Sequence, residues 1–197
     1  LIEKASTNIA LNSGNFANSS WQNTNNAVTY TANATTAPDG TATAASLNFT
    51  SGTASYTYQN IASTSLSPVS SLGSGSIYGT TYTFSVWLWQ PSSGGVNSIG
   101  LRITNGNNGA DQTAVTISLT TTPTRYSVTR TFTVDAPLFI AGLDTRSGAG
   151  GVGNTGICYA WGGQVEQGLS ITSYIPTTGS SATRAQDDVG PVASGVY

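Results

Sequence analysis

The sequence contains no histidine, no methionine and a single cysteine, and only 7% of its 197 residues are charged. Without histidine, neither a Ser-His-Asp relay nor a histidine metal triad can form. With Cys158 alone, the chain has no internal disulfide and no thiolate metal cluster. The apolar neighbours Ile157, Tyr159 and Trp161 indicate that this thiol is buried and inert.

Charge of either sign is scarce as well. Six Lys and Arg residues are spread along the chain, and the formal net charge is −2. Nucleic acid is therefore not an expected partner, since binding it requires a concentrated basic surface. No apolar run approaches the roughly 18 residues of a membrane-spanning helix, so no membrane association is expected either. A surface with so few charges is covered by hydroxyl and amide groups, which suits contact with sugars or with other subunits of an assembly.

Paired carboxylates, which a glycosidase places on either side of a cleft, are not evident in the sequence. Asp111, Asp135 and Asp144 lie in or beside predicted turns, and nothing in the pattern brings them to one point. We therefore predict that the protein is not an enzyme.

What the sequence has in abundance is Thr, Ser, Asn, Gly and Val, and no stretch keeps the 3.6-residue apolar period of a helix. Short alternating segments separated by Gly, Asn and Pro turns predict β-strands. The expected strands are 9–11, 28–30, 43–50, 55–61, 82–89, 98–104, 113–119, 125–134, 138–143 and 157–166. Such a series without helices predicts an all-β antiparallel sandwich or jelly roll. We expect one domain over residues 1–186, with residues 187–197 as a C-terminal extension without an assigned role.

The stretch Tyr82–Trp89 is the strongest of these strands, and the rest of the chain is expected to be organised around it. One face is purely apolar and predicts a core layer: Tyr82, Phe84, Val86 and Leu88. The opposite face ends with Trp87 and Trp89. Two interpretations remain open for these indoles: they line a second buried face, or they form a flat platform on which sugar rings stack.

Arg102 points outward from the strand 98–104, which we expect to lie next to Tyr82–Trp89. Its guanidinium can donate paired hydrogen bonds to hydroxyls or carboxylates. Trp87, Trp89 and Arg102 are therefore the candidate carbohydrate-binding residues.

Both ends of the chain resemble a known family. The runs Ala160–Gly168, Thr172–Gly179 and Thr183–Ala185 resemble the closing signature of a jelly-roll domain in phage tail proteins. That signature reads Trp-Gly-x-Gln-x-Glu, then Ser-Tyr-Ile-Pro-Thr and Thr-Arg-Ala. The opening, Thr7–Ser13 followed by Phe16 and Trp21, is also similar, so that the resemblance spans about residues 5–186. The chain departs from the family at Trp89, where many relatives carry a charged or polar residue.

Relatives of that domain are carbohydrate-binding modules of the galactose-binding-like sandwich type. The resemblance implies a non-catalytic domain of a tail fibre, spike or other appendage on the surface of a phage virion. Its expected partners are host cell-surface polysaccharide and other virion proteins, and a homo-oligomer such as a trimer is plausible. Two alternatives stay open: a structural virion module, for capsid decoration or tail assembly, and a carbohydrate-binding module of a polysaccharide-degrading enzyme.

The resemblance also raises the question of calcium. In sugar-binding relatives with a structural calcium, oxygens of the opening loop and of the last strand hold the ion. The corresponding residues here are Asn12, Asn15 and Glu166, and calcium takes six to eight oxygen ligands. The alternative is that Glu166 is hydrogen-bonded and ties the two ends of the chain together.

A second set of residues is predicted to be structural: Trp161, Gln164, Tyr174 and Arg184. The glycines after Trp161 allow another segment to approach closely, so we expect this indole to anchor the core. Tyr174 is expected to fix a tail that runs along the sandwich. Arg184 is expected to pair with Asp187 or Glu166, or to face a neighbouring subunit.

Overall fold

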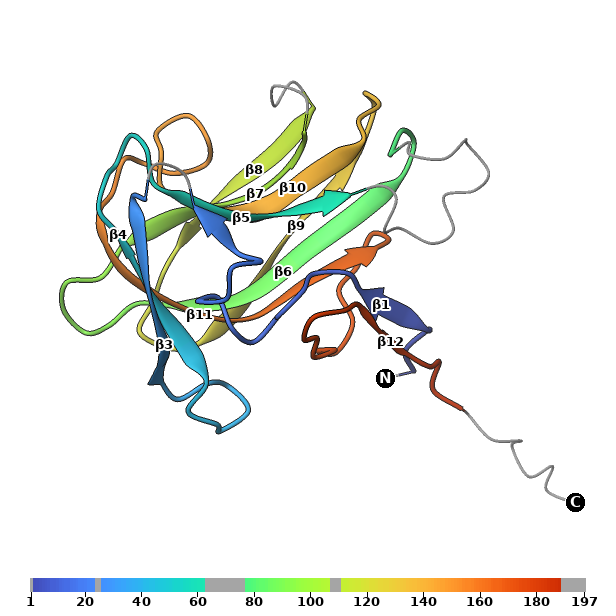
Figure 1. The fold of residues 1–197 in the computed structure, drawn as a ribbon, viewed down its shortest axis with the longest axis horizontal. Coiled ribbons are helices and arrows are strands. Elements are labelled where there is room, and N and C mark those ends of the chain that lie inside the picture. Colours follow the sequence, from blue (N-terminus) through green and yellow to red (C-terminus); the bar gives the residue numbers. More distant parts are fainter. Residues whose placement is uncertain (1, 24–25, 63–76, 107–110, 189–197) are drawn as a thin grey trace, which may run out of the picture.

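The chain folds into two antiparallel five-stranded sheets that face each other (Figure 1). The computed structural model describes residues 2–23, 26–62, 77–106 and 111–188. Sheet I has the strand order β2-β5-β10-β7-β8, and sheet II has the order β3-β4-β11-β6-β9. The strands of sheet I are β2 (Gln22–Asn23), β5 (Tyr56–Ala62), β10 (Leu138–Asp144), β7 (Ser98–Asn105) and β8 (Gln112–Ser118). Those of sheet II are β3 (Val28–Thr35), β4 (Ala44–Phe49), β11 (Gly156–Gln167), β6 (Thr81–Trp89) and β9 (Thr124–Thr131). This confirms the predicted all-β antiparallel sandwich.

The described residues contain no helix, so none that could cross a membrane is found among them. Most predicted strand limits lie within a residue or two of the structure, but β3 extends five residues beyond the predicted 28–30, β9 ends three residues before the predicted 134, and the N-terminus differs. There, β1 (Ser6–Asn8) precedes the predicted strand 9–11 and pairs with β12 (Ala182–Arg184). The Ser- and Gly-rich composition of residues 63–79 predicts a loop; residues 63–76 lie outside the described part of the chain, and Ile77 is buried in the core.

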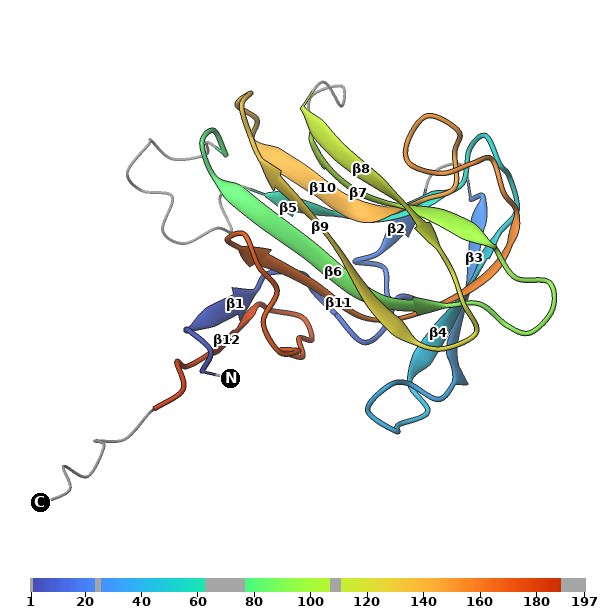
Figure 2. The same ribbon diagram turned by 180° about the vertical axis from the view of Figure 1, so that it is seen from behind.

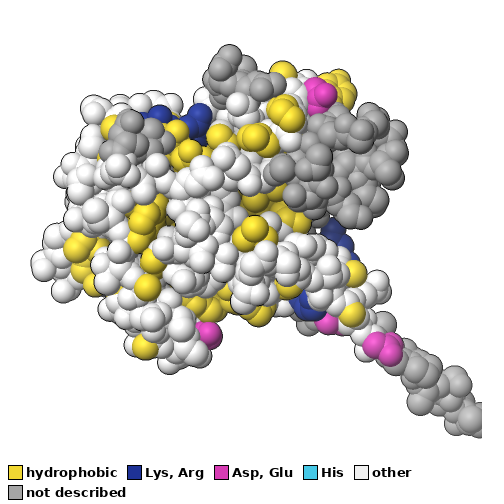
Figure 3. Space-filling model, in the orientation of Figure 1, with side chains coloured by type: hydrophobic (Ala, Val, Ile, Leu, Met, Phe, Trp, Pro, Cys, Tyr) yellow, Lys and Arg dark blue, Asp and Glu magenta, His cyan; other side chains and the backbone are white. Residues whose placement is uncertain are grey.

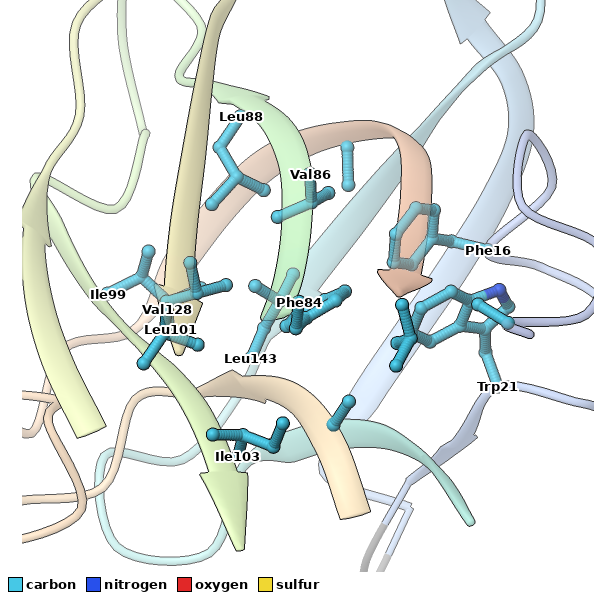
Figure 4. Close-up of a cluster of buried hydrophobic side chains, with 14 of the residues drawn as sticks. Phe16, Trp21, Phe84, Val86, Leu88, Ile99, Leu101, Ile103, Val128 and Leu143 are labelled. Carbon is cyan, nitrogen blue, oxygen red and sulfur yellow. The ribbon is translucent and has the colours of Figure 1, made fainter. Parts of the chain in front are cut away.

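The core fills the space between the sheets, and the alternation of β6 decides which side chains enter it. Tyr82, Phe84, Val86 and Leu88 are buried, as predicted. The facing layer comes from β7 and β10: Ile99, Leu101, Ile103, Phe139 and Leu143. Figure 4 shows these two layers meeting, with Phe16 and Trp21 of the opening segment closing one end. Each such side chain contributes about 1.5–3 kcal/mol by leaving water, which makes this layer the main source of stability.

Cys158 points into the same core from β11 and is fully buried. Burial raises the pKa of its thiol well above the ordinary value, because the thiolate would lose its hydration. The prediction of an inert cysteine is confirmed.

The strand β11 contains a register shift between Trp161 and Gln164. Gly162 there has φ +67°, and a Cβ on it would lie 2.7 Å from the ring of Trp87. The extra residue keeps Trp161 and Gln164 on the same outer side of sheet II, although they are three residues apart. The absence of a side chain at Gly162 therefore lets the Trp87 ring lie close to the backbone of β11, as the sequence predicted.

The two ends of the described chain meet beside the end of β11, as both views show (Figure 2). Glu166 accepts hydrogen bonds from the Ser6 hydroxyl at 2.5 Å and the Thr172 hydroxyl at 2.6 Å. Glu3 accepts from the Ser173 hydroxyl at 2.7 Å and forms an ion pair with Arg184. We call this group (Glu3, Ser6, Glu166, Thr172, Ser173 and Arg184) the terminal clasp. Arg184 thus pairs with Glu3 rather than with Asp187 or Glu166, because β12 runs antiparallel to β1 and places it beside the first residues.

Candidate functional site

The outer face of sheet II is closed by the chain that follows β11. Ile175 and Tyr174 lie over it: the backbone N–H of Ile175 donates to Gln164 at 2.7 Å, and the Tyr174 hydroxyl lies 2.7 Å from the Ser13 hydroxyl. Gln164 itself is fully buried and donates to the Ser173 carbonyl at 3.3 Å. These contacts are those of residues that hold the following chain against sheet II, the role predicted for Gln164 and Tyr174.

Trp87, Trp89 and Trp161 form a second apolar cluster beneath this cover. Trp89 is only 4% exposed and packs with Ala37, Ala44 and Trp161. Trp161 is 5% exposed, and its indole N–H donates to the Thr43 hydroxyl at 3.0 Å. Trp161, predicted to anchor the core, is buried in this second cluster and not in the space between the two sheets.

The half-buried ring of Trp87 is occupied by protein groups. The guanidinium of Arg125 lies 4.4 Å from its ring centroid, and the rings of Trp161 and Tyr174 contact it edge-on. Burial lowers the pKa of Arg125, but the guanidinium stays charged at any physiological pH. The structure therefore supports the interpretation in which Trp87 and Trp89 line a second buried face, and not the one in which they form a platform for sugar rings.

Arg102 does not lie near these indoles. The connection from β6 to β7 crosses from sheet II to sheet I, so β7 pairs with β10 and β8 rather than with β6. The expectation that Arg102 is on a strand next to Tyr82–Trp89 is wrong, because residues 90–97 bridge two sheets instead of forming a hairpin.

The three residues considered for calcium are engaged separately. Glu166 is bound by Ser6 and Thr172 in the terminal clasp. Asn12 donates to the Ser20 hydroxyl at 2.7 Å, and Asn15 accepts from the backbone N–H of Ala17 at 3.1 Å. No group of three or more acidic, His or Cys side chains suited to a metal is found among the described residues. Glu166 is thus hydrogen-bonded and joins the two chain ends, as the alternative expected, while calcium binding by these residues stays a prediction.

The outer face of sheet I is accessible in part: the loop after β10 packs over Gly100, and the Thr116 hydroxyl donates to the Gly150 carbonyl at 2.7 Å, while the rest of the face is left open by the described chain. Strand register arranges its outward side chains in three rows across the sheet. The middle row is Gln22, Tyr58, Gly142, Arg102 and Ala114. One flanking row is Tyr56, Asp144, Gly100 and Thr116, and the other is Asn60, Ile140, Thr104 and Gln112. We call this surface the tyrosine–arginine face.

Gly142 gives the face its shape. It lies between Tyr58 and Arg102 on adjacent strands, about 10 Å apart across two strand spacings. A Cβ on Gly142 would lie 2.2 Å from the Thr57 carbonyl oxygen, so the position has no room for a side chain. The result is a shallow depression with a backbone floor, lined among others by Tyr58, Arg102 and Ile140. Its cavity volume is only about 10 Å³, so a ligand would lie across it rather than enter it.

Two tyrosines supply the aromatic part of this face. The rings of Tyr56 and Tyr58 stack with centroids 4.9 Å apart, and the Arg146 guanidinium lies 4.0 Å from the Tyr56 centroid. Both tyrosines are half-buried. The stack holds the rings in place before any ligand arrives, which lowers the entropic cost of binding.

A buried carboxylate organises the polar part. Asp144 is 1% exposed and accepts from Arg146 Nε at 2.9 Å and from Arg146 Nη2 at 2.5 Å. Arg102 Nη1 contacts the same carboxylate at 3.3 Å, and its Nε donates to Gln112 at 2.9 Å. Hydrogen bonds to Asp144 raise the pKa of Arg146, which therefore remains protonated. These two contacts fix the orientation of the Arg102 guanidinium, whose Nη2 donates to no acceptor in the part of the chain that the structure describes.

Sequence reasoning identified Arg102 but missed Tyr56 and Tyr58. Their strand reads Tyr-Thr-Tyr-Gln-Asn-Ile, and its inward side carries two polar residues, Thr57 and Gln59. Gln59 can be buried because its amide accepts from the Leu11 N–H and donates to the Leu11 carbonyl. The alternation alone therefore suggests the opposite orientation, with the tyrosines inside.

A larger groove, of about 650 Å³, lies beside the terminal clasp and is lined by Lys4, Ser6, Thr7, Gln167 and Thr183. Its one aromatic residue, Tyr82, belongs to the core: its ring stacks on Phe139 at 4.5 Å, and burial raises its pKa to about 12. The groove therefore lacks an accessible ring, and the tyrosine–arginine face remains the better candidate.

Comparison with solved structures identifies the fold. The chain is similar to the enzymatically active domain of bacteriophage CBA120 tailspike protein 4 (TM-score 0.54, 15% identity), with 81% of this chain and 21% of that one covered. It is also similar to the CBM22-1–GH10 modules of Clostridium thermocellum xylanase 10B complexed with xylohexaose (TM-score 0.55, 12% identity, 88% and 30% covered). The chain thus spans less than a third of either of these proteins.

A third neighbour matches over nearly its whole length. It is the CBM22-1 xylan-binding domain of Paenibacillus barcinonensis Xyn10C (TM-score 0.52, 9% identity), with 84% of this chain and 97% of that domain covered. No protein-family model and no curated protein sequence matches the chain. The similarity at such low identity concerns the fold: the chain is a β-sandwich of the jelly-roll type found in carbohydrate-binding modules.

Proposed function

We propose that the protein binds a polysaccharide chain on the tyrosine–arginine face. The observation that carries this proposal is the placement of Tyr58 and Arg102 on either side of the bare Gly142. Aromatic rings contact the apolar C–H faces of sugars, and a guanidinium donates to sugar hydroxyls or carboxylates. Asn60 and Gln112 add exposed amide groups at the edge of the same surface.

The shape of the site favours a chain over a single sugar. The accessible part of the face is shallow and crosses from β5 over β10 to β7, so that successive sugar units can lie along the line from Tyr58 to Arg102. The fold shared with a xylan-binding domain supports the same proposal. The ligand of that domain is not carried over, since its identity to this chain is only 9%.

Binding without cleavage is part of the proposal. A glycosidase uses two carboxyl groups on either side of the bond that it breaks. Among the described residues of the tyrosine–arginine face there is one carboxylate, Asp144, and it is buried and held by two arginines.

We place this binding function on a phage virion appendage that attaches to host surface polysaccharide. The support is the closing signature around Trp161–Glu166 and the similarity to a domain of a phage tailspike. A purely structural virion module remains the competing hypothesis, and it predicts no glycan binding by the isolated chain.

The test is a screen of the purified chain on an array of polysaccharides, followed by affinity measurements with variants. Tyr58→Ala is expected to lower the affinity for the best ligand about tenfold or more, whereas Tyr58→Phe retains most of it because the ring remains. Tyr78→Ala, which removes an exposed tyrosine elsewhere, serves as the matched control. Equal affinities for Tyr58→Ala and the wild type would contradict the proposed site.

A further inference from the structure

We infer that the polysaccharide recognised by the tyrosine–arginine face is acidic, with a hexuronic-acid carboxylate bound by Arg102. This inference rests on the proposed function and specifies its ligand class. It follows from how the few charges of the chain are distributed.

The tyrosine–arginine face carries more positive than negative charge, although the chain as a whole has a net charge of −2. Arg102 and Arg146 lie on it, and Asp144 is the one acid there among the described residues. The other four cations are elsewhere: Arg184 pairs with Glu3, Arg130 pairs with Asp111, Arg125 lies on Trp87, and Lys4 lines the groove beside the terminal clasp. Figure 3 shows how sparse charged side chains are on the viewed surface, so a single excess charge dominates its surroundings.

The excess charge belongs to Arg102. Arg146 donates to Asp144 from its backbone N–H at 2.9 Å, from Nε at 2.9 Å and from Nη2 at 2.5 Å, and its guanidinium thereby neutralises the carboxylate. Arg102 reaches the same carboxylate only at 3.3 Å, on an oxygen that Arg146 already engages. Its remaining partner is the neutral amide of Gln112, and its Nη2 donates to no acceptor among the described residues.

A ligand carboxylate would complete this arrangement. The side chain of Arg102 is 18% exposed, so its free edge is accessible but partly withdrawn from water, which strengthens a charge-assisted bond. Gln112 and Asp144 fix the plane of the guanidinium, so its donors are oriented before binding. Tyr58, on the other side of Gly142, would contact the ring of the same or the neighbouring sugar.

The test compares polysaccharides that differ only in the carboxylate. Polygalacturonate, alginate and a glucuronic-acid-containing capsular polysaccharide are each measured beside their carboxyl-reduced forms, by calorimetry or affinity electrophoresis on the full chain. The wild type is expected to bind at least one acidic form about tenfold more tightly than its reduced form, as one charge-assisted contact implies. That difference is also expected to shrink in high salt.

The variants assign the difference to a residue. In Arg102→Gln the acidic and reduced forms should bind equally, and in Arg102→Lys the preference should be intermediate, since the charge remains but the fork is lost. Lys4→Gln, which removes an exposed charge far from this face, should leave the preference unchanged. Thermal melts identify a variant that has lost its fold, and the wild-type comparison does not depend on any variant.

Two outcomes would overturn the inference and are distinguishable. Equal binding of acidic and reduced forms, with loss of both in Tyr58→Ala, would refute the ligand class and leave the binding face in place. Absence of binding to every polysaccharide, acidic or neutral, would refute the proposed function and the inference with it.

Discussion

Tyr58 and Arg102 lie opposite the same residue, Gly142, one on each neighbouring strand of β10. Gly142 has no side chain, so only backbone separates the positions of Tyr58 and Arg102, and both residues line the shallow depression there. The two chemical groups that sugar recognition commonly uses are thus brought together by strand register rather than by a loop. This relationship between Tyr58 and Arg102 defines the candidate site.

The first prediction concerns the floor of the site. Gly142→Ala is expected to destabilise the fold by about 1–3 kcal/mol, because the added methyl group would lie 2.2 Å from the Thr57 carbonyl oxygen and displace β5. Binding should weaken as well, since Tyr58 moves with that strand. Chemical denaturation measures the first effect. Gly40→Ala is the control for stability: its φ is +86° but nothing lies within 4 Å of the added Cβ, so any loss there reports backbone strain alone.

A second prediction concerns the buried indoles. Trp89→Ala and Trp161→Ala should each cost about 3–5 kcal/mol of unfolding free energy, because both remove a large side chain from the closed cluster on sheet II. In any variant that still folds, polysaccharide affinity should be unchanged. A Trp89→Ala variant that keeps its melting temperature but loses polysaccharide binding would contradict this prediction. It would support the interpretation in which the indoles bind the sugar rings.

Intrinsic fluorescence offers a third prediction. All four tryptophans lie away from the tyrosine–arginine face. Trp21 is buried against Phe16, and the other three lie on the outer side of sheet II. Saturating ligand should therefore leave tryptophan emission essentially unchanged while calorimetry reports binding. A large emission shift that follows the binding isotherm would contradict this placement.

The terminal clasp makes stability depend on pH. Hydrogen bonds from Ser173, together with the charge of Arg184, lower the pKa of Glu3 below its ordinary value of 4.5. A lowered pKa in the folded state contributes stability above about pH 4.5, and the contribution is lost as pH falls through the folded-state pKa. Melting temperatures between pH 7 and pH 3 should thus fall less steeply for Glu3→Gln than for the wild type. The control is Asp188→Asn, which removes an exposed carboxylate further along the chain. If the melting temperatures of Glu3→Gln and the wild type fell equally at low pH, the contribution of Glu3 to pH-dependent stability would be refuted.

The sequence predicted most strands to within a residue or two, because alternation and Gly/Asn/Pro turns are local signals. Pairing is not local. The segment from Gln90 to Asn97 resembles a hairpin turn in sequence, yet it connects β6 in sheet II to β7 in sheet I. Arg102 and Trp87 therefore lie on different sheets. The structural residues Gln164 and Tyr174 were predictable, since they lie in the signature that resembles a known family.

The candidate site was predictable only in part. Arg102 was identified because a lone cation in an apolar strand must point outward. Tyr56 and Tyr58 were not, because the inward residues of β5 include Gln59, whose burial depends on the Leu11 backbone almost fifty residues earlier in the chain. A strand with polar residues on both sides gives no reliable orientation from its pattern alone.

The most direct test of the central claim is an NMR titration of the isotope-labelled chain with the polysaccharide fragment that binds best. The account predicts that the amide shifts concentrate on β5, β10 and β7, with the largest changes around Tyr58, Gly142 and Arg102. Shifts confined to β6, β11 and the segment around Tyr174, with β5 and β7 unaffected, would contradict it.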